Sequence, residues 1–140
     1  MKKVILTVII ALVSVISNAQ LVVKEAGKDT VIWQATKLAT VPKIVKFTID
    51  SLDSYTIYYR NAKYSTITDI DYITTGDLET TIQFYELCKS VGETGKEYNI
   101  ELDNKTLILS KGTMGTIMIW SEYSYFYLSA KQVTAILEKL

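Results

Sequence analysis

The sequence predicts an α+β fold in which an antiparallel β-meander sheet packs against two helices. Short segments of alternating apolar and polar residues follow one another with turns between them, as in antiparallel meanders. Two longer segments, Asp77–Val91 and Ser129–Leu140, place apolar residues at the spacing of a helix instead. Because each helical segment follows a run of strands, we expect the helices to pack on one side of the sheet.

The first strand segments lie near the N-terminus. Leu21–Lys24 and Thr30–Trp33 form a predicted hairpin with Gly27 in its turn. The next residues, Gln34–Val41, have no clear period. They end at Pro42, the only proline, which disfavours helix at the preceding residue and marks the entry to the main sheet.

Three further strands are predicted after this proline: Lys43–Asp50, Tyr55–Arg60 and Tyr64–Ile73. Alternation places three apolar residues on one face of the first of these strands: Val45, Phe47 and Ile49. It does the same in the second: Tyr55, Ile57 and Tyr59. The third is rich in Thr, Ile and Tyr, which favour strands.

The central helix is predicted over Asp77–Val91. Its apolar arc fills more than half of the circumference, so the helix must pack between other elements. The arc holds Leu78, Ile82, Phe84, Tyr85, Leu87, Cys88 and Val91. Thr74 or Asp77 is the expected N-cap, and the stretch from Gly92 to Gly95 is the expected end.

The second half repeats this order of elements. Four strands are predicted: Tyr98–Leu102, Thr106–Lys111, Thr116–Trp120 and Tyr123–Leu128. The closing helix, Ser129–Leu140, begins with a capping box formed by Ser129 and Gln132 and a hydrophobic staple formed by Leu128 and Val133. The two halves therefore have a common pattern of strands followed by a helix, which is consistent with a duplicated unit.

The N-terminus has the pattern of a secretory signal peptide. Two lysines precede the uncharged apolar run Val4–Ile16, and Ser17-Asn18-Ala19 supplies the small residues that signal peptidase requires. The apolar run rises only about 20 Å as a helix, less than the roughly 30 Å of a bilayer core. We therefore predict cleavage of residues 1–19 after Ala19. Because the signal peptide is of a Gram-negative type, we also predict export to the periplasm or the medium.

Cleavage leaves residues 20–140, the size of one domain, which we expect to be a single α+β unit. It also leaves 13 basic and 15 acidic residues, a net charge of −2. No transmembrane anchor is expected in the mature form. Cys88 is the only cysteine, so we expect a small buried hydrophobe there, with an intermolecular disulfide or a reactive thiol as the alternative.

The composition lacks the residue types that most enzyme active sites use. The chain contains no histidine, so the commonest general base and metal ligand are missing, and no phosphate-binding glycine loop occurs. Carboxylates remain. Asp69 and Asp71 share a face of a predicted strand and are weak candidate ligands for a metal; a solvated strand face that leads to a helix N-terminus is the favoured explanation. A hydrolase would have to draw on scattered carboxylates: Asp50, Asp53, Asp69, Asp71 and Glu122.

Tyrosine is the other unusual feature, with ten residues in the chain. Tyr123, Tyr125 and Tyr127 alternate along the last predicted strand, whereas Phe126 and Leu128 take the opposite, helix-covered face. Such a row offers a large contact area with polar tips, which suits protein or glycan binding. Cross-strand pairing of tyrosines on a sheet surface is the alternative explanation. Three further residues complete the predicted binding set: Trp120, Tyr58 and Arg60, the only arginine.

These observations predict an exported, non-enzymatic binding or structural domain that contacts a protein or glycan through a tyrosine-rich sheet face, without a cofactor or a metal. A carboxylate-based hydrolase is the first alternative. The order of elements over Lys43–Leu140 is also similar in outline to the Whirly and PUR folds. That resemblance implies a sheet that presents aromatic side chains to single-stranded nucleic acid. The net charge of −2 and export both oppose this second alternative.

Overall fold

The computed structural model describes residues 27–36, 42–64, 66 and 68–140, and its elements repeat one pattern twice. The first half contains β1 (Lys28–Gln34), β2 (Lys43–Ile49), β3 (Leu52–Arg60), β4 (Ile70–Gly76) and α2 (Leu78–Thr94). The second half contains β5 (Tyr98–Leu102), β6 (Lys105–Lys111), the 3₁₀ turn η1 (Thr113–Gly115), β7 (Thr116–Trp120), β8 (Tyr125–Ser129) and α3 (Ala130–Leu137). The predicted order of strands followed by a helix is confirmed in both halves.

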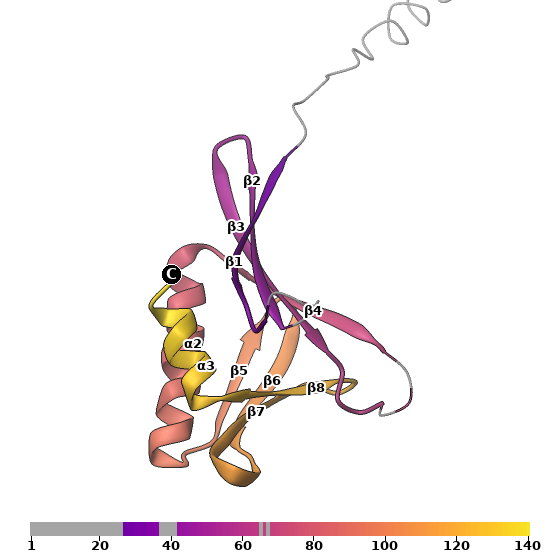
Figure 1. Ribbon diagram of the computed structural model, residues 1–140, viewed down its shortest axis with the longest axis vertical. Coiled ribbons are helices and arrows are strands. Elements are labelled where there is room, and N and C mark those ends of the chain that lie inside the picture. Colours follow the sequence, from indigo (N-terminus) through magenta and orange to yellow (C-terminus); the bar gives the residue numbers. More distant parts are fainter. Residues whose placement is uncertain (1–26, 37–41, 65, 67) are drawn as a thin grey trace, which may run out of the picture.

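The strands form two antiparallel meanders, β1-β2-β3-β4 and β5-β6-β7-β8. The α+β class is therefore confirmed, and the meander is divided into two four-stranded sheets by helix α2. Figure 1 shows α2 and α3 side by side on one side of the molecule, with the β1–β3 region extending away from them. Helix α2 packs against strands of both sheets, and α3 packs against α2 and β8.

The first sheet is aligned so that Ile44, Ile57 and Ile73 lie opposite one another on adjacent strands, each at most 1% exposed. They face the helices. The apolar row predicted for β2 does share a face, the one opposite Ile44; along it Val45 is only 3% exposed, whereas Ile49 is 54% exposed. The register with β3 decides this, because Ile44 pairs with Ile57 on the inner face.

The N-terminal predictions are only partly described. Strand β1 contains the predicted Thr30–Trp33 segment and pairs with β2 in antiparallel register. Residues Leu21–Lys24, the first strand of the predicted hairpin, and the predicted signal peptide lie outside the described residues. Pro42 directly precedes β2, as expected of a residue that marks the entry to the sheet. The observed strand is shorter than the predicted Tyr64–Ile73 and lies later in the chain, since β4 begins at Ile70 and continues to Gly76.

Helix α2 begins after Asp77, whose side chain accepts a hydrogen bond from the Thr80 N–H at 2.8 Å. It runs to Thr94, three residues beyond the predicted end, and stops at Gly95, which has a φ of 72°. Only glycine adopts this left-handed conformation without a steric penalty, so it ends the helix. The side facing the sheets buries Thr81, Phe84, Tyr85, Cys88 and Val91.

Helix α3 has the predicted capping box. The Ser129 side chain accepts from the Gln132 N–H at 3.1 Å, and the Gln132 side chain accepts from the Ser129 N–H at 2.9 Å. The helix ends at Leu137, before the predicted end at Leu140. Strand β8 begins at Tyr125, two residues later than predicted. The cause is a turn that follows β7, described below.

One cluster of buried residues joins both halves, with members from β2, β3, β4, α2, β6, β7, β8 and α3. The packing of Tyr59 from β3 on Phe126 from β8 is its closest aromatic contact, with ring centroids 4.0 Å apart. Within the described ranges, no helix combines the length and the hydropathy needed to cross a membrane.

Candidate functional site

The outer side of the second sheet carries a cluster of large side chains on β6, β7 and β8. Trp120 pairs across the strands with Tyr125 and with Ile108, and Met118 pairs with Tyr127. We call these five residues the aromatic face: Ile108, Met118, Trp120, Tyr125 and Tyr127. The alternation predicted for the last strand places Phe126 and Leu128 in the core, 4% and 1% exposed.

The members of the aromatic face are accessible to different degrees. Trp120 is 39% exposed and Tyr127 is 44% exposed, whereas Tyr125 is half-buried. The rings of Tyr125 and Tyr127 meet edge to face, with centroids 5.7 Å apart. This geometry is favourable for aromatic pairs and holds both rings in place. The face therefore presents a preorganised aromatic surface.

Tyr123 does not belong to the strand, contrary to prediction. The chain turns at residues 121–124, where the Ser121 N–H donates to the Ser124 carbonyl oxygen at 2.8 Å. Tyr123 lies in this turn and is 71% exposed. A hydrogen bond to the Glu122 carboxylate raises its pKa above the usual value. The predicted row of three tyrosines is instead two tyrosines beside Trp120.

Tyr58 lies on a different surface, the outer side of the first sheet. It pairs across the strands with Tyr72, and their ring centroids are 6.1 Å apart. The Lys43 ammonium lies 5.3 Å from the Tyr58 ring centroid, and the Lys105 ammonium lies 5.2 Å from that of Tyr72. Both are within the range of cation–π attraction. Tyr58 thus belongs to an aromatic pair with two cations rather than to the aromatic face.

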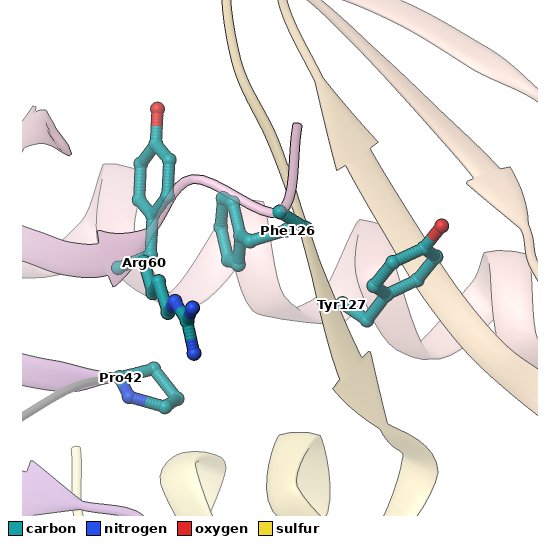
Figure 2. A pocket seen from close by; sticks show the side chains of 6 residues that line it. Pro42, Arg60, Phe126 and Tyr127 are labelled. Atoms are coloured by element: carbon teal, nitrogen blue, oxygen red, sulfur yellow. The ribbon is translucent and has the colours of Figure 1, made fainter. Parts of the chain in front are cut away.

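Arg60 lies at the rim of a hollow between the two halves. The hollow has a volume of about 200 Å³ and is lined by Pro42, Tyr59, Arg60, Ala62, Phe126 and Tyr127. Figure 2 shows the Arg60 side chain extending toward the rings of Pro42 and Phe126. Tyr127 therefore belongs both to the aromatic face and to the wall of this hollow. Of the predicted binding residues, Arg60 and Tyr127 are the two that the fold brings together here.

Asp71 takes part in a polar network that joins the two sheets. Its Oδ2 accepts hydrogen bonds from Ser124 Oγ at 2.7 Å and from the Tyr59 hydroxyl at 2.9 Å. Its Oδ1 accepts from the Tyr72 N–H at 2.8 Å and lies 3.6 Å from the Lys105 ammonium. Tyr59 and Asp71 come from the first half, and Ser124 and Lys105 come from the second. The carboxylate therefore has a structural role at the junction.

The charge of Asp71 is stabilised in the folded protein. Burial alone acts to raise its pKa, but hydrogen bonds from Ser124, Tyr72 and Tyr59 and the charge of Lys105 outweigh that effect, so the pKa lies below the usual value. Burial raises the pKa of the Tyr59 hydroxyl, and the neighbouring Asp71 raises it further. Tyr59 thus stays neutral and Asp71 ionised at physiological pH.

Asp69, the second candidate metal ligand, is also engaged. Its Oδ2 accepts from the side-chain amide of Asn61 at 3.1 Å. Asn61 in turn accepts from the Tyr125 N–H at 3.3 Å, which links β8 to the end of β3. Among the residues that the structure describes, no group of three or more His, Cys, Asp or Glu side chains is placed to hold a metal ion.

The remaining carboxylates of the hydrolase alternative are dispersed. Asp53 accepts from Thr48 Oγ1 at 2.6 Å and lies 3.4 Å from the Lys46 ammonium, near the β2–β3 turn that contains Asp50. Glu122 lies in the turn between β7 and β8. Asp53 is therefore held in the first hairpin, apart from the junction network around Asp71.

Cys88 lies on the inner side of α2 and is fully buried. Burial raises the pKa of its thiol far above the usual value. A buried neutral thiol behaves as a small hydrophobe, as expected from its place in the apolar arc.

The residues of the junction were not predicted from the sequence. Asn61, Ser124 and Lys105 carry no local pattern that distinguishes them from ordinary turn or surface residues, and Pro42, Ala62 and Phe126 line the hollow only because the two halves meet there. Ser124 lies 65 residues from Tyr59 and 53 from Asp71 in the chain. Only the buried polar character of these contacts identifies them as a group.

Comparison of the chain with protein-family models, with curated proteins and with solved structures yields no match.

Proposed function

We propose that this protein is an exported, non-enzymatic binding domain that contacts a protein or glycan through the aromatic face. The observation that carries the proposal is the clustering of Trp120, Tyr125 and Tyr127 on the outer side of β7 and β8, with Trp120 and Tyr127 more than a third exposed. Large aromatic side chains supply contact area at a low cost in rotamer entropy, and they are enriched at binding surfaces.

The distribution of residues on this sheet supports binding over simple strand pairing. The strands away from β8 expose polar residues on the same outer side, namely Asn99, Glu101 and Thr106. An apolar patch with a polar rim is the usual anatomy of an interaction surface.

Export is proposed on the N-terminal pattern of the sequence, a basic start, an apolar run and Ser17-Asn18-Ala19. The absence of histidine from the chain and the engagement of Asp71 in the junction network support a non-enzymatic role. The intact mass of protein recovered from a cell envelope or medium tests export. A mature chain that begins at Gln20 is expected, and a membrane fraction that retains residues 1–19 would contradict it.

The binding experiment compares single variants of the aromatic face. Tyr127→Ser and Trp120→Ser are each passed, with the parent protein, over a glycan array and over envelope-protein extract with mass-spectrometric identification of captured partners. Truncation of an aromatic anchor at an interface typically costs about 2–4 kcal/mol, a roughly thirty-fold to thousand-fold loss of affinity. Both variants should lose the parent's partner and keep a cooperative melting transition, because exposed strand residues affect stability by about 1 kcal/mol or less.

Two variants serve as controls. Tyr72→Ser removes a ring of comparable exposure, 51%, from the outer side of the first sheet, and it should leave binding intact. Phe126→Ser opens the core and should unfold the protein. Binding that depends on Tyr72 and not on Trp120 or Tyr127 would place the contact on the first sheet, away from the aromatic face, and refute the proposal.

A single-stranded nucleic-acid-binding function is the second candidate, and one observation favours it. Lys43 and Lys105 lie over the rings of Tyr58 and Tyr72, and rings and cations together are what bases and phosphates require. Fluorescence anisotropy of a labelled oligothymidine tests it. Binding that weakens steeply between low and high salt and is lost in Tyr72→Ser would favour this candidate. If the protein does not bind the oligothymidine even at low salt, the nucleic-acid-binding function is refuted.

A further inference from the structure

Trp120 lies in a row of side chains that crosses the outer side of the second sheet. Strand pairing places one residue from each of the four strands in this row: Asn99, Ile108, Trp120 and Tyr125. The indole ring is more than a third exposed, so a ligand can reach it. Among aromatic side chains, tryptophan attracts a cation over its ring face most strongly. The row therefore contains a ring suited to binding a cation.

Two carboxylates lie at the end of β7 that Trp120 occupies. Glu101 pairs with Thr106 of β6, which is two residues from Ile108 and therefore on the same outer side. Glu101 is thus in the row next to that of Trp120, about 7 Å further along the strands. Glu122 follows Trp120 by two residues, in the turn after β7. Both glutamates are exposed.

Neither glutamate is paired with a cation among the residues that the structure describes. Glu101 accepts a hydrogen bond from Thr106 Oγ1 at 2.7 Å, and Glu122 accepts one from the Tyr123 hydroxyl. The ion pairs of the described ranges lie in the first hairpin and at the junction. Because a carboxylate has about four acceptor positions, each glutamate can still accept from an ammonium or a guanidinium group.

Tyrosine rings elsewhere in the protein do have a cation over them. Three lysine ammonium groups lie 5.2 or 5.3 Å from a ring centroid: Lys43 with Tyr58, Lys96 with Tyr98 and Lys105 with Tyr72. Within the same described part of the chain, no lysine or arginine lies over Trp120. Trp120 therefore lacks the internal cation that these tyrosines have, and the two glutamates beside it lack one as well.

We propose that the aromatic face binds a lysine or arginine side chain from an extended segment of a partner protein, with the cation over the Trp120 ring and in reach of Glu101 and Glu122. Complementary charge selects such a partner, because a ring face and two carboxylates all attract a cation. A neutral sugar would stack on tryptophan without any need for the carboxylates. The inference rests on the proposed function, since it specifies the partner of the same face.

The face also indicates which residue accompanies the cation. Met118 lies two residues before Trp120 on β7 and pairs with Tyr127. In an extended partner segment that runs along β7, residues i and i+2 have the same separation of about 7 Å. An apolar side chain two residues from the cation would therefore pack on Met118 and Tyr127. The expected partner segment has a basic residue, any residue and then an apolar residue.

The experiment titrates a short peptide of this pattern into the parent protein with NMR detection. The probe is N-acetyl-Gly-Lys-Ser-Leu-Gly-amide, and its control carries acetylated lysine, which has no charge. The lysine peptide should perturb the signals of the aromatic face. Acetylation should weaken its binding about ten-fold, because the cation–π contact and the attraction to two carboxylates are lost. High salt should narrow this difference, since exposed charges are screened.

Variants of the face locate the cation. Trp120→Leu keeps an apolar side chain without the ring and should weaken the lysine peptide about three-fold to thirty-fold. The double variant Glu101→Gln, Glu122→Gln should weaken it about three-fold to ten-fold and leave the acetylated peptide unchanged. Glu79→Gln, Glu86→Gln removes two exposed carboxylates from α2 and is the matched control, with a change in Kd of less than about two-fold.

Melting curves show which of these variants remain folded. The glutamine substitutions in the face remove charge from exposed side chains and keep their size, so this double variant is decisive if Trp120→Leu does not fold.

Four outcomes would overturn the inference. Three concern the peptides: no perturbation of the face by the lysine peptide, equal affinity for the lysine and acetylated peptides, or an unchanged affinity in Glu101→Gln, Glu122→Gln. The fourth is a neutral glycan that is bound through Trp120 whether or not the two carboxylates are present. An arginine version of the peptide identifies the preferred cation, and tighter binding of either version supports the site.

Failure here is distinguishable from failure of the proposed function. Partner capture that is lost in Trp120→Ser but kept in Glu101→Gln, Glu122→Gln retains the aromatic face as a binding surface and removes the cation. If the lysine peptide needs Trp120 and both carboxylates while no captured partner does, the cation site is retained and the proposed function is removed.

Discussion

Asp71 connects four residues of the two sheets through a single carboxylate, and it does so while 30% of its side chain stays exposed. Partial exposure limits the cost of burying its charge, and the hydrogen bonds from Ser124 and Tyr59 satisfy the oxygen nearest the core. A carboxylate placed in this way stabilises a junction.

Asp71→Asn should lower the free energy of unfolding by about 1–2 kcal/mol at pH 7, because it removes charge-assisted hydrogen bonds and the attraction to Lys105. The pKa of Asp71 is depressed in the folded state. Its contribution is therefore complete above its unfolded pKa of about 4, and it is lost as the pH falls through the lower folded value. Urea denaturation of both proteins at pH 7 and pH 2.5 checks this.

Asp69→Asn is the matched control, since Asp69 accepts a single hydrogen bond from the Asn61 side chain. It should cost less than Asp71→Asn at pH 7. A difference between Asp71→Asn and the parent that persists undiminished at pH 2.5 would show that the charge of Asp71 is not the source of the stabilisation.

Cys88 gives the second prediction at this scale. Its thiol is buried and its pKa is raised by that burial, so both access and ionisation disfavour reaction. A thiol reagent should label the native protein many times more slowly than the protein in denaturant, with the native rate limited by opening of the structure. Rapid native labelling, or a dimer that a reductant dissolves, would indicate a functional thiol.

At the scale of elements, helix α2 was predicted correctly, but the burial of some of its residues was not. The amphipathic pattern predicted the helix and its cap at Asp77, but it treated the whole apolar arc as equally buried. The structure buries Phe84 and Val91 completely and leaves Leu87 partly exposed at the edge of the core. The arc is wider than the surface that the two sheets and α3 can cover.

Three substitutions in α2 should therefore rank in order of burial. Phe84→Ala should destabilise the protein by about 3–5 kcal/mol through loss of contacts and a residual cavity. Leu87→Ala should cost less, about 1–2 kcal/mol, because part of that side chain stays in water. Glu86→Ala, on the exposed side, should be nearly neutral. Chemical denaturation at a common pH measures all three, and a larger loss for Leu87→Ala than for Phe84→Ala would mean that the helix is rotated.

At the scale of the whole molecule, the two halves are joined by a common core. Helix α2 packs on both sheets, and the stacked pair of Tyr59 and Phe126 combines one ring from each half. The Ala62 N–H also donates to the Tyr125 carbonyl oxygen at 2.7 Å, a backbone bond between the end of β3 and β8. Although each half has its own sheet, neither buries its inner face alone.

Unfolding should consequently be a single cooperative transition for both halves. The chain provides a probe of each, since its two tryptophans are Trp33 in β1 and Trp120 in β7. Trp33→Phe leaves Trp120 as the single tryptophan, which reports on the second half. Trp120→Phe leaves Trp33, which reports on the first half. In each variant, the unfolding midpoint measured by tryptophan fluorescence should coincide with the midpoint measured by circular dichroism. A fluorescence midpoint that departs from the dichroism midpoint in either variant would show that the halves unfold separately.

Features that depend on neighbours within a few residues could be predicted from the sequence. Alternation in the last strand correctly assigned Phe126 and Leu128 to the core and Tyr125 and Tyr127 to the outside. The capping box at Ser129 correctly marked the start of α3. These signals are local because side-chain direction in a strand and hydrogen bonding at a helix end are set by adjacent backbone geometry.

How these elements meet depends on contacts between residues far apart in the chain. The division into two sheets, the place of Ile44 rather than Val45 in the main core and the turn that removes Tyr123 from β8 all depend on which strands pair and in what register. The junction network and the hollow require residues that are distant in the chain, such as Tyr59 and Ser124. No short stretch of sequence encodes such contacts, because their free energy arises only when separate faces bury each other.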